Sequence, residues 1–209
     1  MFKSLTNIFR VQELRDRILY TVMAILVYRI GSHIPTPGID PTALLEFLSS
    51  AQGGGGLLTI MDLFSGGALF RFSILALGIM PYISASIIMQ LLGVVIPALE
   101  RMQKEGESGR KKINQYVRYL ALVLCIIQSA AMASWIQSIN EGAMIYMNPG
   151  LGFVLIVVAT ATAGTMFLMW LGDQITERGL GNGISVIIFA GIVARIPAGV
   201  YDMIQKKDS

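Results

Sequence analysis

Residues 72–96, near the middle of this 209-residue chain, contain no charged side chain and are mostly apolar. A helix needs about 20 apolar residues to cross roughly 30 Å of hydrocarbon, so this stretch predicts a membrane span, broken at Pro81. The preceding Gly-rich piece, 59–71, is too short and too polar to cross alone and predicts a short re-entrant helix. A re-entrant piece beside a span suits a pore with a movable stopper.

Four further apolar stretches occupy residues 18–34, 119–137, 153–172 and 184–201. The chain is 54% hydrophobic and only 14% charged, a balance outside that of soluble domains. We therefore predict an all-α polytopic membrane bundle with five spans. The first span is not a cleaved secretory signal, because Pro-rich sequence and further spans follow it.

The positive charges are distributed unevenly. Four positive charges lie near the N-terminus: Lys3, Arg10 and Arg15 in the tail 1–16, and Arg17 directly after it. Loop 97–118 carries six Lys or Arg residues, whereas loops 35–71 and 138–152 hold only Arg71. Orientation follows the Lys/Arg bias of short loops, so the N-terminus is expected in the cytoplasm. Loops 97–118 and 173–183 would then also be cytoplasmic.

Two polar segments have alternative interpretations. The tail 1–16 spaces Phe2, Leu5 and Phe9 as an amphipathic interfacial helix would, although a frayed tail explains it equally well. Loop 97–118, a Gly-containing polar hairpin, suits water, anionic lipid or an acidic partner, or serves simply as a positive-inside anchor.

Small residues recur in the last two spans. Ala159 and Ala163 mark the fourth, and Ala190, Ala194 and Ala198 repeat every four residues in the fifth. Small side chains let helix backbones approach closely in lipid, so these positions predict packing faces inside a bundle.

Fragments that resemble enzyme motifs lack the context that catalysis requires. Gly179, Gly181 and Gly183 follow no strand, and the Gly106–Gly109 fragment lies across the membrane from the only histidine, His33. One histidine and one cysteine, Cys125 within a span, cannot build a closed metal site. We expect no enzyme activity, no cofactor and no metal.

Polar side chains inside the spans are few. The Lys or Arg residues within the predicted spans are Arg29 and Arg195, and Arg29 lies close enough to a span end to extend to the interface. The neutral groups, suited to hydrogen bonds between helices that separate, are Ser84, Ser86, Gln90, Gln128 and Ser129.

Ile79 and Ile83 lie four residues apart around Pro81 and predict one common face. Facing lipid is the ordinary expectation for isoleucine in a span. An apolar constriction that gates by dewetting is the alternative. Spacing does not choose between them.

Several strings resemble those of bacterial SecY, the family of channel subunits of the Sec protein translocon. They are IPTPGID (34–40), MDLFSGGALFR (61–71), ALGIMPYISASII (76–88), KEGESGRKK (104–112), GTMFLMWLGDQITERGLGNGIS (164–185) and FAGIVA (189–194). The resemblance implies one half, spans one to five, of a ten-span inverted-repeat channel whose second half is absent from this chain.

By position, the resemblance implies four functional groups. Ile79, Ile83 and Ile188 correspond to the pore ring, and Ser84, Gln90 and Gln128 to the lateral gate that admits signal sequences. Arg110, Lys111, Lys112 and Arg178 are candidate cytoplasmic partner contacts. The plug corresponds to Met61, Asp62, Leu63, Phe64, Ser65, Gly66, Gly67, Ala68 and Leu69. A stopper that leaves its seat should be loosely packed and hinged.

The resemblance further implies passive conduction of unfolded nascent chains in the bacterial cytoplasmic membrane, with a signal sequence opening the gate and releasing the plug. Its partners would be SecE, SecG, either the SecA motor or a ribosome, the lipid bilayer, and the second half of the channel, with no nucleic-acid specificity. The rival interpretation is half of a secondary transporter, which also uses broken helices and inverted repeats.

Overall fold

The computed structural model describes residues 11–40, 42, 44, 60, 62–139 and 150–194. The regular elements in these ranges are helices, which confirms the all-α class. In chain order they are α2 (Gln12–Gly31), α5 (Met80–Val95), α6 (Pro97–Lys104), α7 (Glu107–Ile139), α8 (Leu151–Arg178) and the helix Gly183–Ala194. Among these residues, the pairing closest to a strand is an isolated bridge between Pro35 and Ser73.

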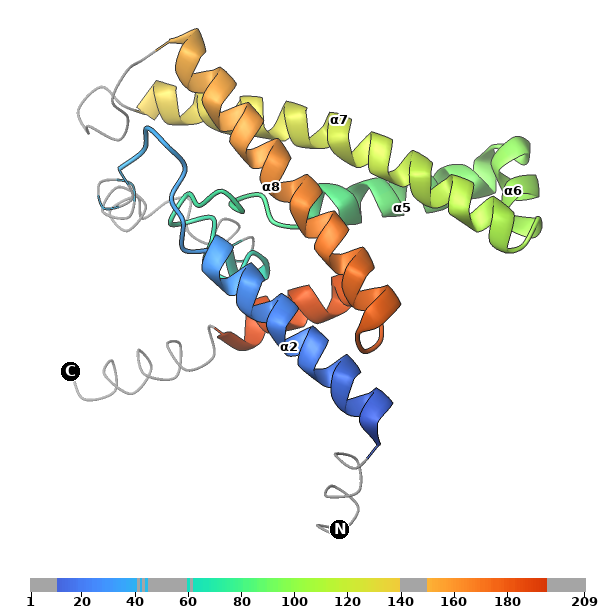
Figure 1. Ribbon diagram of the computed structural model, residues 1–209. Helices are drawn as coiled ribbons and strands as arrows, with labels where there is room; N and C mark the ends of the chain where they lie inside the picture. Colours follow the sequence, from blue (N-terminus) through green and yellow to red (C-terminus); the bar gives the residue numbers. More distant parts are fainter. Residues whose placement is uncertain are drawn as a thin grey trace, which may run out of the picture.

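The two long helices form the framework. Figure 1 shows α7 and α8 meeting where α7 ends and α8 begins and diverging towards their other ends. Helix α5 packs along α7, and α2 packs against α8. The helix Gly183–Ala194 returns behind α2 in the view of Figure 1. Described residues of the segment 62–79 therefore contact elements from both ends of the chain.

The uncharged stretch 72–96 is helical only from Met80 onwards. Residues 72–79 form turns, because Phe72 and Gly78 have φ values of 42° and 57°, outside the helical region. Pro81 then falls at the second helical position, where its missing N–H would have no intrahelical partner. The expected break in the span is thus a helix start, and the predicted span 72–96 is wrong over its first eight residues.

At its other end α5 bends sharply into α6. The angle between the two helices is 103° across Ile96, with Pro97 as the first residue of α6. Helix α6 is followed by a turn at Glu105 and Gly106, and α7 begins at Glu107. Loop 97–118 is therefore largely helical, and the predicted polar hairpin is the two-residue turn between α6 and α7.

Among the described helices, two are long and apolar enough to cross a membrane: Glu107–Ser138 and Leu151–Arg178. The bent pair α5 and α6 makes a third when counted as one span. Helix α2 starts at Gln12 rather than at residue 18, which brings Glu13 and three further charged residues into it. The five-span count stays a prediction.

Several predicted segments lie partly outside the described residues. These are the tail up to residue 10, positions 59 and 61 of the plug, most of loop 138–152, and the fifth span beyond Ala194. The turn predicted at 173–183 is shorter, because α8 continues to Arg178 and the next helix starts at Gly183. The fourth and third spans are likewise parts of the longer helices α8 and α7.

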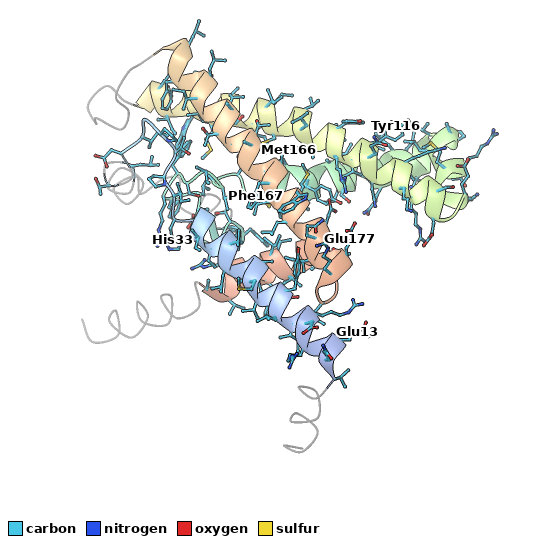
Figure 2. The ribbon with its side chains drawn as sticks, in the orientation of Figure 1. Glu13, His33, Tyr116, Met166, Phe167 and Glu177 are labelled. Atoms are coloured by element: carbon cyan, nitrogen blue, oxygen red, sulfur yellow. The ribbon has the colours of Figure 1, made fainter. Side chains whose placement is uncertain are left out.

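Close helix packing occurs at small residues, but not at all the predicted ones. Ala121 and Ala133 of α7 are fully buried, and a Cβ on Gly164 of α8 would overlap the carbonyl oxygen of Ile74. Ala159 and Ala163 are exposed, because they lie on the opposite face of α8 from Ala161 and Gly164. That exposed face also carries Met166 and Phe167, midway along α8 in Figure 2.

Candidate functional site

The predicted plug is held against α2. The hydroxyl of Tyr28 donates a hydrogen bond to the Ser65 carbonyl oxygen at 3.0 Å, and the guanidinium of Arg29 donates to the Gly66 carbonyl oxygen at 3.2 Å. Tyr28 is only 2% exposed. Arg29 therefore binds the plug backbone, a contact that the expectation of an interfacial side chain did not include.

The plug segment also has internal hydrogen bonds. The Asp62 carboxylate accepts from the Phe70 N–H at 2.9 Å, and the Asp62 carbonyl accepts from the Gly67 N–H at 2.9 Å. Ser65 donates its hydroxyl to the Asp62 carbonyl and accepts from the Leu69 N–H. Gly66 and Gly67 have φ values of 68° and 88°, a conformation that favours glycine.

A third contact comes from the helix Gly183–Ala194. A Cβ built on Gly191 would lie 3.3 Å from the Phe64 carbonyl oxygen and 3.4 Å from the Gly66 Cα. The turn around Ser65 thus contacts both α2 and this last helix. Asp62, Ser65, Ala68 and Leu69 are buried, so the expectation of a loosely packed stopper is wrong for most of the described plug; Leu63 and Phe64 are exposed, and Met61 lies outside the described residues.

The three predicted ring isoleucines share one apolar cluster. Ile79 is buried in it, and Ile83 and Ile188 are half-buried against it. Ala68 of the plug belongs to the same cluster. Ile79 precedes the first residue of α5, yet its carbonyl accepts the Ile83 N–H at 3.1 Å, which keeps the two side chains one turn apart. The cluster joins α5, the last helix and the plug.

The predicted gate residues are not gathered at one point. Gln128 of α7 borders an apolar cavity of about 320 Å³, together with Met80 at the start of α5 and Leu69 of the plug. Gln90 is exposed ten residues further along α5, about 15 Å at 1.5 Å per residue, and donates to Ser86. Ser84 is half-buried between these levels. All three nonetheless lie on α5 and α7, which pack against each other.

The basic candidates lie where α7 and α8 diverge. Arg110, Lys111 and Lys112 are exposed near the start of α7, and Arg178 is exposed at the end of α8. Lys111 borders a polar cleft of about 390 Å³ between the two helices. On α6, the ammonium of Lys104 donates a hydrogen bond to Glu100 and lowers the pKa of that carboxyl.

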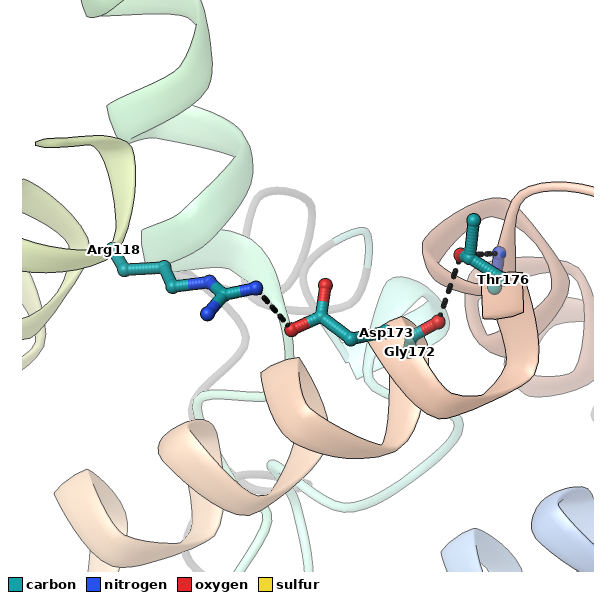
Figure 3. Close-up of polar contacts among 5 residues, drawn as sticks. Arg118, Gly172, Asp173 and Thr176 are labelled. Carbon is teal, nitrogen blue, oxygen red and sulfur yellow. Dashed lines mark hydrogen bonds and ion pairs between the residues drawn. The ribbon is translucent and has the colours of Figure 1, made fainter. Parts of the chain in front are cut away.

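Two interactions at this end were not predicted. Arg118 of α7 and Asp173 of α8 form an ion pair at 2.6 Å across the cleft (Figure 3). Thr176 donates to the Gly172 carbonyl and accepts from the Gly183 N–H, which connects α8 to the next helix. The two residues of the ion pair lie 55 positions apart, so no local sequence pattern indicates that they meet. Glu177 borders the same cleft and lies near the end of α8 in Figure 2.

The described part of the chain contains no assembled site for hydrolysis or for metal binding. His33 is exposed at the end of α2, with its Nδ1 2.8 Å from the Arg29 carbonyl oxygen. Within the described ranges, no three His, Cys, Asp or Glu side chains lie close enough together to hold a metal ion. Cys125 is buried in α7 against Ala161 of α8.

Comparisons with known proteins agree with this arrangement. A family model described as SecY matches residues 73–208. The chain is 50% identical over 209 residues to the protein translocase subunit SecY of Aquifex aeolicus, covering 99% of this chain and 48% of that protein. It is 54% identical over 194 residues to the protein of the same name in Escherichia coli, covering 93% of this chain and 43% of that protein.

The fold also matches a solved structure of Sec61 in the canine ribosome–channel complex from the endoplasmic reticulum. The TM-score is 0.61 at 18% identity, over 88% of this chain and 38% of that one. The chain spans about half the length of the curated relatives that it matches. With a family model matching well over half of its residues and relatives at about half identity, the chain belongs to the SecY family.

Proposed function

We propose that the chain is the first half of a protein-conducting channel subunit, and not an enzyme. The observation that carries the proposal is the shared apolar cluster: Ile79, Ile83 and Ile188 meet there with Ala68 of the plug. Side chains that faced only lipid would not converge from three separate elements. Family membership favours a channel over half of a secondary transporter.

In the proposed mechanism the channel is passive. The isoleucines form part of an apolar constriction that excludes water and ions by dewetting, and the plug closes it on one side. A signal sequence enters at the lateral gate, for which Ser84, Gln90 and Gln128 are candidates, and biases a closed-to-open equilibrium. The unfolded chain then passes, with the driving force supplied by a partner.

The proposed partners follow from the family. SecE and SecG would complete the translocon, and SecA or a ribosome would dock at the cytoplasmic side, where Arg110, Lys111, Lys112 and Arg178 are exposed cations. The Sec61 neighbour was solved in a ribosome complex, which supports the ribosome as one such partner. The location would be the bacterial inner membrane, with the N-terminus in the cytoplasm.

The test uses the full-length channel, meaning this sequence together with the second half that its relatives carry, in planar bilayers. Ile83→Ser should raise resting ion conductance several-fold, because a hydroxyl wets the constriction. Ile87→Ser is the matched control, since Ile87 lies one turn further along α5 and is exposed. Equal conductance in both variants and the parent would contradict the proposal, and saturable uptake of a small solute would favour a transporter.

A further inference from the structure

We propose that Tyr28 and Arg29 of α2 are positioning residues that latch the plug in its closed seat. The inference rests on the proposed function, because it assigns a closed and a released state to the plug segment. It adds two residues outside the plug, the pore ring and the gate. Both donate to main-chain carbonyls of the plug, at Ser65 and Gly66.

Tyr28 combines a buried ring with a single side-chain hydrogen bond among the described residues. Its ring lies within the apolar cluster that contains Ile79 and Ala68, and its hydroxyl reaches the Ser65 carbonyl at 3.0 Å. A buried hydroxyl without a partner is unfavourable, so the bond fixes where the Ser65 turn must lie. A phenylalanine at this position would fill the same space but could not donate.

Arg29 lies one residue later on the same helix. A guanidinium near the end of a membrane helix is energetically unfavourable unless it has a hydrogen-bond partner. Here it donates to the Gly66 carbonyl oxygen at 3.2 Å. Because both acceptors are backbone oxygens, the latch holds the plug without depending on its side chains.

Gly66 and Gly191 make the seat close enough for these bonds. A Cβ on Gly66 would lie 2.8 Å from the Tyr28 hydroxyl oxygen and 3.0 Å from the Gly191 Cα. The Tyr28 hydroxyl and the bare backbone of Gly191 thus both lie against the same face of the plug turn. Two hydrogen bonds of this kind shift an equilibrium by about two- to tenfold each, weak enough for a signal sequence to overcome.

The first experiment measures the open fraction of the full-length channel in planar bilayers without a translocating chain. Tyr28→Phe should raise it about two- to tenfold, and Arg29→Gln by a similar or larger factor. Tyr20→Phe is the matched control, because Tyr20 lies on the same helix and its hydroxyl points to Gln174 instead. In parallel, the thiol introduced by Leu63→Cys should be alkylated faster when combined with either latch variant than when combined with the control.

A second arm separates the latch from the plug itself. In a channel lacking residues 60–70, Tyr28→Phe should change nothing further, because its acceptor is gone. If that deletion alone leaves conductance unchanged, the proposed plug function fails. The latch is overturned, and the plug function stands, if the deletion raises conductance while both latch variants conduct like Tyr20→Phe. The same conclusion follows if Tyr28→Phe raises conductance equally with and without residues 60–70.

Discussion

The plug and the segment that follows it are adjacent in sequence but are held in different ways. The proposed plug, described over residues 62–71, is held by side chains of α2 that donate to its carbonyls. Residues 72–79 are held by α8, where Gly164 lies against the Ile74 carbonyl and Thr165 donates to the Gly78 carbonyl at 3.2 Å. Residues 34–36 add backbone bonds to Phe72 and Ile74.

In the proposed function, the first of these segments moves and the second belongs to the framework against which it moves. A Cβ on Gly164 would overlap the Ile74 carbonyl oxygen, whereas a Cβ on Gly66 would lie 3.0 Å from the Gly191 Cα, so residues 72–79 are packed more tightly against the framework than the plug is. Two hydrogen bonds to carbonyls can break and re-form, because other donors can replace them. We therefore expect substitutions beside 72–79 to change the stability of the whole channel, and substitutions beside 62–71 to change only the state of the plug.

The largest effect should come from Gly164→Ala in α8. The new Cβ would overlap the Ile74 carbonyl oxygen, and overpacking of this kind costs about 1–3 kcal/mol. Denaturant titration of the full-length channel in detergent would measure the free energy of unfolding. Gly152→Ala, on the same helix with no described atom within 4 Å of its Cβ, should instead stabilise by about 0.5–1 kcal/mol. A change in the free energy of unfolding with the same sign in both variants would contradict the inference that α8 fixes residues 72–79.

A smaller and local effect is expected from Asp62→Ala. It removes the acceptor of the Phe70 N–H, which would cost about 1–2 kcal/mol within the plug. Hydrogen–deuterium exchange of peptides covering 62–71 would then accelerate, while peptides of α7 keep their protection. Asp62→Asn keeps an oxygen that can accept the same bond and should exchange more slowly than the alanine variant. Uniform acceleration across the chain would mean that the plug is part of the framework.

Sequence reasoning predicted the helical class, which the structure confirms, because apolar length indicates it directly. The pore ring of Ile79, Ile83 and Ile188 came from the family motifs and stays a prediction, although the three residues share one apolar cluster. Sequence reasoning missed the start of α5, since residues 72–79 are as apolar as the helix, and apolarity does not distinguish a buried turn from a span. Gly78 three residues before Pro81 was the available signal for a turn followed by a helix start.

The latch and the ion pair were beyond sequence reasoning for another reason. Arg29 donates to a backbone carbonyl, and any residue can supply one, so no partner residue marks the contact. Arg118 and Asp173 lie on different helices, and their meeting depends on how α7 and α8 cross. Ala159 and Ala163 carry the small-residue signal, but Gly164, one position further, makes the close approach to the backbone of residues 72–79.

Two threonines on α8 test how residues 72–79 are held, with smaller expected changes in the free energy of unfolding. Thr165 is buried and bonds the Gly78 carbonyl, so Thr165→Val should cost about 0.5–1.5 kcal/mol. Thr162, three residues earlier, has a buried hydroxyl without a hydrogen-bond partner among the described residues. Thr162→Val should be neutral or stabilising, because an unsatisfied hydroxyl is removed. Equal losses in the two variants, by the same titration, would mean that the Gly78 bond does not hold the segment.

The smallest effect should be at the open end of the framework, where Arg118 and Asp173 connect α7 and α8 across the polar cleft. Both side chains are a third to a half exposed, and water screens such pairs. A double-mutant cycle with alanine at each position should give a coupling of about 0.2–1 kcal/mol that falls as salt is raised. The exposed pair of Lys104 and Glu100 within α6 is the control, because it makes no link between helices. A salt-independent coupling well above this range would mean that the ion pair, rather than the buried small residues, keeps α7 and α8 together.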